Sequence, residues 1–91
     1  MSSDIQTKSV TVSNEEGLHA RPASLFAQMA NQFNARILVT RGEESVDGKS
    51  ILSILTLGAT KGVQLTIRAE GADADLAVEQ LSHLVESGFD E

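Results

Sequence analysis

One stretch of strict alternation limits what this chain can fold into. In VQLTIRAE, residues 63–70, every second residue is apolar and the residues between them are polar. A period of two is the spacing of a β-strand with one buried face. That face needs a cover, and the chain has only 91 residues and no cysteine to stabilise it by disulfide bonds. We therefore expect residues 1–91 to form a single domain in which amphipathic segments of the same chain cover a sheet.

Three segments have apolar residues at helical spacing and can supply that cover. The first begins at Ala20 and has Asn34 as a suitable end, and the last begins at the acidic stretch DAD, residues 73–75, where negative charge favours a helix N-terminus. A short helix between them is indicated by Ser50, a good N-cap residue, and by Gly58, which can follow the last helical turn. The apolar positions of the two longer helices are Ala23, Phe26, Ala27, Ala30 and Phe33, and Ala77, Leu81, Leu84 and Val85.

Three further strands complete the expected fold. Apolar residues alternate in SVTVS, residues 9–13, and two more strands, residues 35–41 and 44–48, are joined by a tight turn at Gly42. The order is βαββαβα. It predicts the α+β class, an open-faced β-sandwich in which helices cover one face of a four-stranded antiparallel sheet and the other face is solvated.

Charge and hydropathy exclude several classes of function. The net charge of −6 disfavours nucleic acid or an anionic membrane as a partner. No run approaches the roughly 20 apolar residues of a membrane span, and none has the length of a signal peptide, so we expect a cytoplasmic protein. Thiolate chemistry needs cysteine, and the sequence shows neither an acidic cage for magnesium nor a nucleotide-binding loop. We therefore expect no metal and no cofactor.

The motif GLHARPAS, residues 17–24, places one histidine directly before the first helix. Backbone N–H groups of a first helical turn lack intrahelical acceptors and attract anions, and Arg21 adds a charged donor in the same turn. Because neutral imidazole has a nucleophilic nitrogen, these residues support covalent phosphoryl relay through His19. Two alternatives stay open: an unreactive helix-cap histidine, and a metal site with Glu15 or Glu16, which has too few ligands for a closed zinc site.

Three motifs, GLHARPAS, GKSILSILTLGA and AEGADADLAVEQLSHLV, together resemble a known family in register from Val10 to Val85. It is the family of histidine-containing phosphocarrier proteins, HPr, of the bacterial phosphoenolpyruvate-dependent phosphotransferase system. The resemblance implies that His19 accepts a phosphoryl group on Nδ1 from the phosphohistidine of enzyme I and passes it to a histidine of an enzyme II A component. Arg21 would clamp the phosphate, and the backbone N–H groups of Ala20 and Arg21 would complete the cradle. The resemblance implies a carrier of a transferred group, not a self-sufficient enzyme.

The second motif contains a candidate control site at Ser50. The resemblance implies that this serine is phosphorylated by HPr kinase/phosphorylase in many bacteria, and that the modified protein is a corepressor partner of a catabolite-control transcription factor. The short helix has more aliphatic residues than one face can bury, so Ile51, Leu52 and Leu55, with Lys49 beside them, are expected to form an exposed partner-binding patch near the histidine. The alternative is that Ser50 is only a helix cap.

Several features depart from the family pattern or leave its branch open. Glu16 stands where many members have Ser or Asn, and a carboxylate there would repel an incoming phosphoryl group, depending on its orientation. The tail ESGFDE is similar to the nitrogen-related paralogue, whereas GKSIL favours the sugar-type carrier, which we rank first. A regulatory binding module controlled at Ser50, with an idle His19, is a third possibility. His83 lies off the apolar stripe of its helix and is expected to be a surface histidine.

Overall fold

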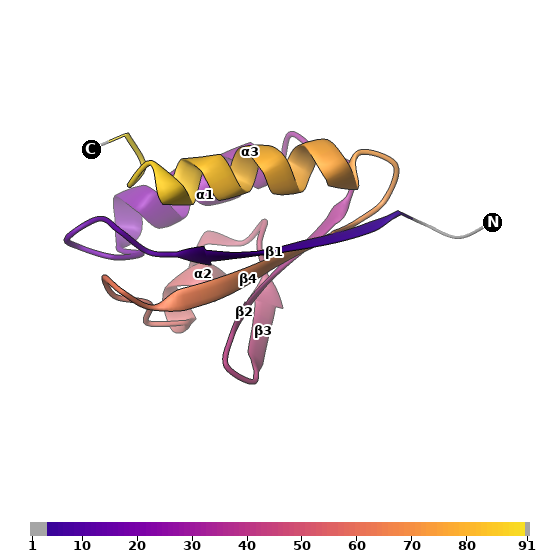
Figure 1. Cartoon of the computed structure of the whole chain (residues 1–91). Helices are drawn as coiled ribbons and strands as arrows, with labels where there is room; N and C mark the ends of the chain where they lie inside the picture. The colour runs from indigo at the N-terminus through magenta and orange to yellow at the C-terminus, as the bar shows by residue number, and fades with distance from the viewer. Residues whose placement is uncertain (1–3, 91) are drawn as a thin grey trace.

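The computed structural model describes residues 4–90 and has the predicted βαββαβα order. The elements are β1 (Ile5–Thr11), α1 (Ala20–Ala30), β2 (Arg36–Arg41), β3 (Glu44–Asp47), α2 (Ile51–Thr56), β4 (Gln64–Glu70) and α3 (Ala74–Glu86). Helices α1 and α3 lie on one face of the sheet (Figure 1) and pack against each other, and α2 packs against α1 beside β3. The predicted α+β open-faced sandwich is therefore confirmed.

The four strands form one antiparallel sheet in the order β1-β4-β2-β3. The alternating stretch forms β4, in the centre of the sheet, and its apolar residues Leu65, Ile67 and Ala69 all face the helices. The register sets Val10 of β1 opposite Leu65, and Val39 of β2 opposite Ile67. Each of these pairs is buried, so the sheet contributes a continuous aliphatic surface to the core.

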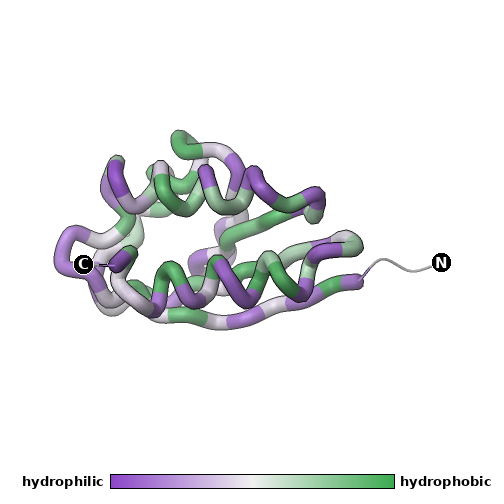
Figure 2. Tube along the Cα trace, turned by 90° about the horizontal axis from the view of Figure 1, so that it is seen from above, coloured by the Kyte–Doolittle hydropathy of each residue, from purple (hydrophilic) through white to green (hydrophobic). Residues whose placement is uncertain are grey.

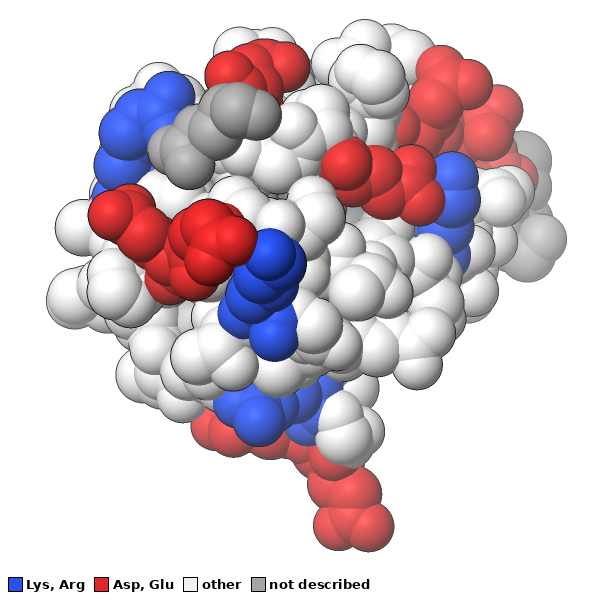
Figure 3. Space-filling view, turned by 60° about the vertical axis from the view of Figure 1, so that its left-hand side comes forward, with Lys and Arg blue, Asp and Glu red and all other residues white. Residues whose placement is uncertain are grey.

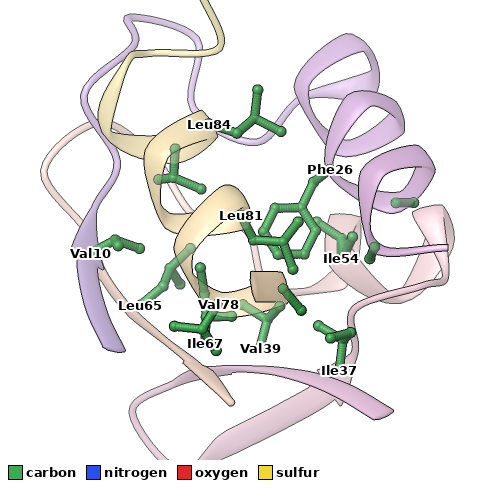
Figure 4. Close-up of a cluster of buried hydrophobic side chains, with 14 of the residues drawn as sticks. Val10, Phe26, Ile37, Val39, Ile54, Leu65, Ile67, Val78, Leu81 and Leu84 are labelled. Atoms are coloured by element: carbon green, nitrogen blue, oxygen red, sulfur yellow. The ribbon is translucent and has the colours of Figure 1, made fainter. Parts of the chain in front are cut away.

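The core is almost entirely aliphatic, with Phe26 of α1 near its centre. Figure 4 shows Phe26, Leu81 of α3 and Ile54 of α2 converging from the three helices, and each of the three is at most 2% exposed. Along both longer helices, hydrophobic and hydrophilic residues alternate turn by turn (Figure 2), as expected when one stripe faces a sheet. Burying one large aliphatic side chain contributes about 1.5–3 kcal/mol to the stability of the fold, which explains how so small a chain remains folded.

Two element boundaries differ from the sequence prediction by more than the one or two residues seen at the other ends. The first strand begins at Ile5, which pairs with Glu70 of β4, and not at residue 9. The sequence did not indicate this start because β1 is an edge strand in which only Val10 is buried, so residues 5–9 have no apolar alternation. The first helix ends at Ala30, not near Asn34. The side-chain amide of Asn31 donates to the carbonyl of Ala27 at 2.8 Å and to that of Lys49 at 3.0 Å. These bonds fix the end of the helix to the segment before α2.

Asp73 joins the start of α3 to the segment between α1 and β2. Its carboxylate accepts hydrogen bonds from the backbone N–H groups of Asn34 and Ala35, both at 2.8 Å, and makes no side-chain bond to its own helix. The bond from Asn34 is the main reason that the pKa of this carboxyl lies below its ordinary value. The acidic residue predicted to start the helix thus stabilises a contact between distant segments.

Within residues 4–90, no helix has both the length and the apolar character needed to cross a membrane.

Candidate functional site

His19 is the N-cap residue of α1 and is solvent-exposed. Its backbone is extended, with φ −76° and ψ −171°, and its carbonyl accepts the first helical hydrogen bond from Ala23 at 2.9 Å. The imidazole makes no capping hydrogen bond to the helix. The ring is therefore not used to cap α1, whose first-turn N–H groups lack intrahelical acceptors.

The loop before His19 is held against the segment that follows α2. Gly17 has φ +68°, and a Cβ at this position would lie 2.4 Å from the carbonyl oxygen of Ala59, so only glycine fits. The next residue, Leu18, donates its N–H to that same oxygen at 2.9 Å. Asn14 closes the loop from the other side, because its Nδ2 donates to the Gly17 carbonyl at 2.8 Å. The backbone that carries His19 is thus fixed on both sides.

An ion pair crosses the same two segments. The ammonium of Lys61 donates to Oε1 of Glu15 at 2.6 Å, and this hydrogen bond lowers the pKa of the Glu15 carboxyl. Both side chains are more than half exposed, so the pair contributes little to stability. Glu16, the residue whose orientation the sequence left open, is exposed, and among residues 4–90 no ion pair includes it.

His19 lines an open hollow of about 350 Å³ at this end of the molecule. Its lining residues are Leu18, His19, Ala20, Leu55, Gly58, Ala59 and Thr60. Three of them come from the segment after α2, so α1 and α2 meet at the hollow from different parts of the chain. Such an open, mostly uncharged hollow suits a small group attached to the imidazole better than an enclosed substrate.

Arg21 lies in the first turn of α1 but lines a different hollow, of about 340 Å³, between α1 and the end of α3. Its neighbours there include Leu25 and Met29 of α1, and Phe89 after α3. The structure therefore brings His19 and Ala20 together in one hollow and places Arg21 at the next one.

The second motif lies on α2 largely as predicted. Ser50 is the N-cap residue, and its hydroxyl accepts from the Ser53 N–H at 3.2 Å. The three predicted patch residues are exposed, with Ile51 at 40%, Leu52 at 76% and Leu55 at 36%. Of these, Leu55 also lines the His19 hollow.

Lys49, predicted beside the patch, is directed elsewhere. Its ammonium donates to the Phe33 carbonyl at 2.7 Å, and the residue is half-buried. The ammonium of Lys49 therefore stabilises the contact between the segment after α1 and the start of α2.

The sequence gives no sign of Arg41, which contacts the wall of the His19 hollow from the end of β2. Its Nη1 donates to the carbonyl oxygens of Leu57 and Gly58, two residues after α2 that are 16 and 17 positions away in the sequence. No local pattern reveals a contact over that separation.

Side chains of one charge sign do not gather in a single patch at this end of the molecule. Figure 3 shows basic and acidic side chains side by side, with broad uncharged areas between them. Within the described residues, no group of three or more His, Cys, Asp or Glu side chains could hold a metal ion.

Comparisons with known proteins cover nearly the whole chain. A family model described as "PTS HPr component phosphorylation site" matches residues 6–87. The phosphocarrier protein HPr of Vibrio cholerae is 44% identical over 79 residues, which are 87% of this chain and 93% of that protein. The phosphocarrier protein NPr of Shewanella violacea is 38% identical over 84 residues, 92% of each chain. The crystal structure of HPr from Thermoanaerobacter tengcongensis superposes with a TM-score of 0.91 at 40% identity, covering 94% of this chain and 97% of that one.

Proposed function

The chain belongs to the HPr family of phosphotransferase-system components, and from that premise we propose that it carries a phosphoryl group on His19 from enzyme I to enzyme II A components. The observation that carries the proposal is the exposed imidazole of His19, at the N-terminus of α1, on a loop fixed by Gly17 and Leu18. A rigid loop keeps the nucleophile in one position for successive partners. An exposed position lets those partners reach it.

The transfer balances as an exchange of one nitrogen–phosphorus bond for another. The Nδ1 lone pair of His19, with the ring proton on Nε2, attacks the phosphorus of the enzyme I phosphohistidine. A bond from Nδ1 to phosphorus forms as the donor bond breaks, and the donor imidazole keeps the electron pair of that bond and leaves neutral, because its other ring nitrogen carries a proton. Hand-over to an enzyme II A histidine repeats the exchange in the opposite sense, which leaves His19 as it began.

The first turn of α1 stabilises the charge of the bound phosphoryl group. The backbone N–H of Ala20 lies at the helix N-terminus, where amides lack intrahelical acceptors and attract anions. We assign the phosphate clamp to Arg21, whose long side chain must turn from the hollow between α1 and α3 toward His19. The Arg21→Ala variant should therefore slow transfer with little effect on folding.

The proposed branch is sugar uptake, with the nitrogen-related relay as the alternative. GKSIL around Ser50 supports the first, and the ESGFDE tail and the similarity to the Shewanella protein support the second. Incubating the phosphorylated protein with purified sugar-type and nitrogen-type enzyme II A components separates the two. Faster transfer to the nitrogen-type component would overturn the sugar assignment.

Phosphorylation of Ser50 is the proposed control, through HPr kinase/phosphorylase and a catabolite-control transcription factor. The hydroxyl lies next to Ile51 and Leu52, so a dianion there would place charge against an exposed apolar surface. We expect the kinase to label the wild type and not Ser50→Ala. If normal sugar uptake persisted in a His19→Ala strain while Ser50→Ala abolished repression, the protein would be a regulatory binding module instead.

The decisive experiment adds phosphoenolpyruvate and enzyme I to the purified protein. We expect the mass of one phosphoryl group, labile in acid and stable in base, and its loss in His19→Ala. His83→Ala is the matched control, because His83 is an exposed histidine on α3 outside the hollow. If the wild-type protein stayed unmodified, or if His19→Ala were still labelled, the relay through His19 would be excluded.

A further inference from the structure

Arg41 connects the end of β2 to the wall of the His19 hollow. Its Nη1 donates to the carbonyl of Leu57 at 2.8 Å and to that of Gly58 at 2.9 Å. Leu57 is the C-cap residue of α2, so its carbonyl is among those that a helix C-terminus leaves without intrahelical partners, and Gly58 follows it with φ +59°. The guanidinium thus closes the end of α2 from a neighbouring strand.

The same segment holds the backbone of the nucleophile. Gly58 and Ala59 both line the hollow with His19, and Ala59 accepts the Leu18 N–H at 2.9 Å. A short connected path therefore runs from Arg41 through the residues after α2 to the residue before His19. A displacement of that wall would move the loop that carries the imidazole.

The guanidinium also changes the charge at the hollow. Without Arg41, two backbone carbonyls with partial negative charge would be left at the end of α2, and one of their residues, Gly58, lines the hollow with His19. Hydrogen bonds from a cation offset that charge. The result favours an anion in the hollow even though Arg41 need not touch it.

We propose that Arg41 is a positioning residue for phosphoryl transfer, holding the wall of the His19 hollow and offsetting the carbonyl charge at the end of α2. The inference rests on the proposed function, because it concerns His19 as the phosphoryl acceptor. Arg41 acts through Leu57 and Gly58, and not by contact with the reacting atoms.

The test compares variants that remove the hydrogen bonds, the charge or both. Arg41→Met removes both, Arg41→Gln keeps a donor without charge, and Arg41→Lys keeps a charged donor without the planar fork. Arg36→Met is the matched control: Arg36 lies at the other end of β2, is exposed, and has no ion pair or side-chain hydrogen bond within residues 4–90. The two Met variants lose the same charge from the same strand.

Three measurements are made on each full-length variant: the rate of phosphorylation by enzyme I, the lifetime of the phosphohistidine, and hydrogen exchange at the Leu18 amide. We expect Arg41→Met to slow phosphorylation about fivefold, to shorten the lifetime of the phosphohistidine and to speed hydrogen exchange at Leu18. Arg41→Lys should lie closest to the wild type, and Arg41→Gln should lie between Arg41→Lys and Arg41→Met. Arg36→Met should match the wild type. If Arg41→Met does not fold, Arg41→Gln is compared with Arg36→Gln in its place.

The outcomes separate this inference from the proposed function. If the wild type accepts no phosphoryl group, the proposed function fails. If the wild type is phosphorylated but Arg41→Met equals Arg36→Met in rate and lifetime, Arg41 has no positioning role. Faster exchange at Leu18 with an unchanged rate would also overturn the inference, because the contact would then serve stability alone.

Discussion

Replacing Gly17 by alanine tests how closely the His19 loop packs against the segment after α2. The residue has φ +68°, and its Cβ would lie 2.4 Å from the Ala59 carbonyl oxygen and 2.8 Å from Cα of Thr60. Both neighbours are backbone atoms, which cannot rotate away as a flexible side chain can. Either the two segments separate or the residue gives up its conformation.

The expected cost has two parts. An L residue in the left-handed region costs about 1–2 kcal/mol. Overpacking against backbone costs about 1–3 kcal/mol, including loss of the Leu18 to Ala59 hydrogen bond, so Gly17→Ala should lower the free energy of unfolding by about 2–5 kcal/mol. Gly42→Ala is the matched control, because Gly42 has φ +60° and, in the part of the chain that the structure describes, no atom within 4 Å of its Cβ position. That variant should lose about 1–2 kcal/mol.

Urea unfolding followed by circular dichroism measures both variants, and phosphorylation by enzyme I measures the effect on His19. Relief of the contact requires a shift of roughly 0.6 Å, which we expect to slow phosphorylation about tenfold under conditions where the variant is folded. Gly42→Ala should be phosphorylated at the wild-type rate. Equal losses of stability in the two variants would refute the close approach of Gly17 to Ala59.

Three further predictions concern stability. Ser82→Ala should raise the free energy of unfolding by about 1 kcal/mol, because the Ser82 hydroxyl is buried on α3 and has no hydrogen-bond partner among residues 4–90; a loss in urea titration would contradict this. The folded-state pKa of Asp73 lies below the unfolded value, so its contribution is present above about pH 4 and is lost as the pH falls through the folded pKa. The Asp73→Asn variant should accordingly lose less stability than the wild type between about pH 6 and pH 3, and equal losses in thermal melts would count against the bond to Asn34. Ile54→Ala should cost about 2–5 kcal/mol but Leu52→Ala less than about 0.5, and a large cost at Leu52 would mean that the exposed patch is part of the core.

Local patterns predicted most of the fold. The alternation of residues 63–70 located the central strand β4, and the apolar spacing of α1 and α3 located the helices that cover it. Gly58 ends α2 with φ +59°, as its position after the helix predicted. The errors lie at β1, an edge strand, and at the end of α1, because contacts with other segments set those boundaries.

In the candidate site, too, some features follow from local sequence and others from contacts between distant segments. The motif GLHARPAS predicted that His19 lies directly before a helix, since helix-capping preferences are a local property, whereas its role as phosphoryl acceptor follows from the family resemblance and stays a prediction. The exposed patch on α2 was predictable because six helical residues cannot bury so many aliphatic side chains on one face. Neither Arg21 beside the end of α3 nor Lys49 bonded to Phe33 could be placed in this way.

What the sequence determined by itself was therefore the order of the elements, the aliphatic core and the place of His19 directly before a helix, all of which follow from spacing over a few residues. Only the tertiary structure decided how the loop that carries His19 is held. Gly17 meets Ala59 across 42 positions of sequence, and Arg41 reaches Gly58 across 17. Such contacts depend on how strands and helices pack, and a backbone carbonyl has no sequence signature that could announce its partner.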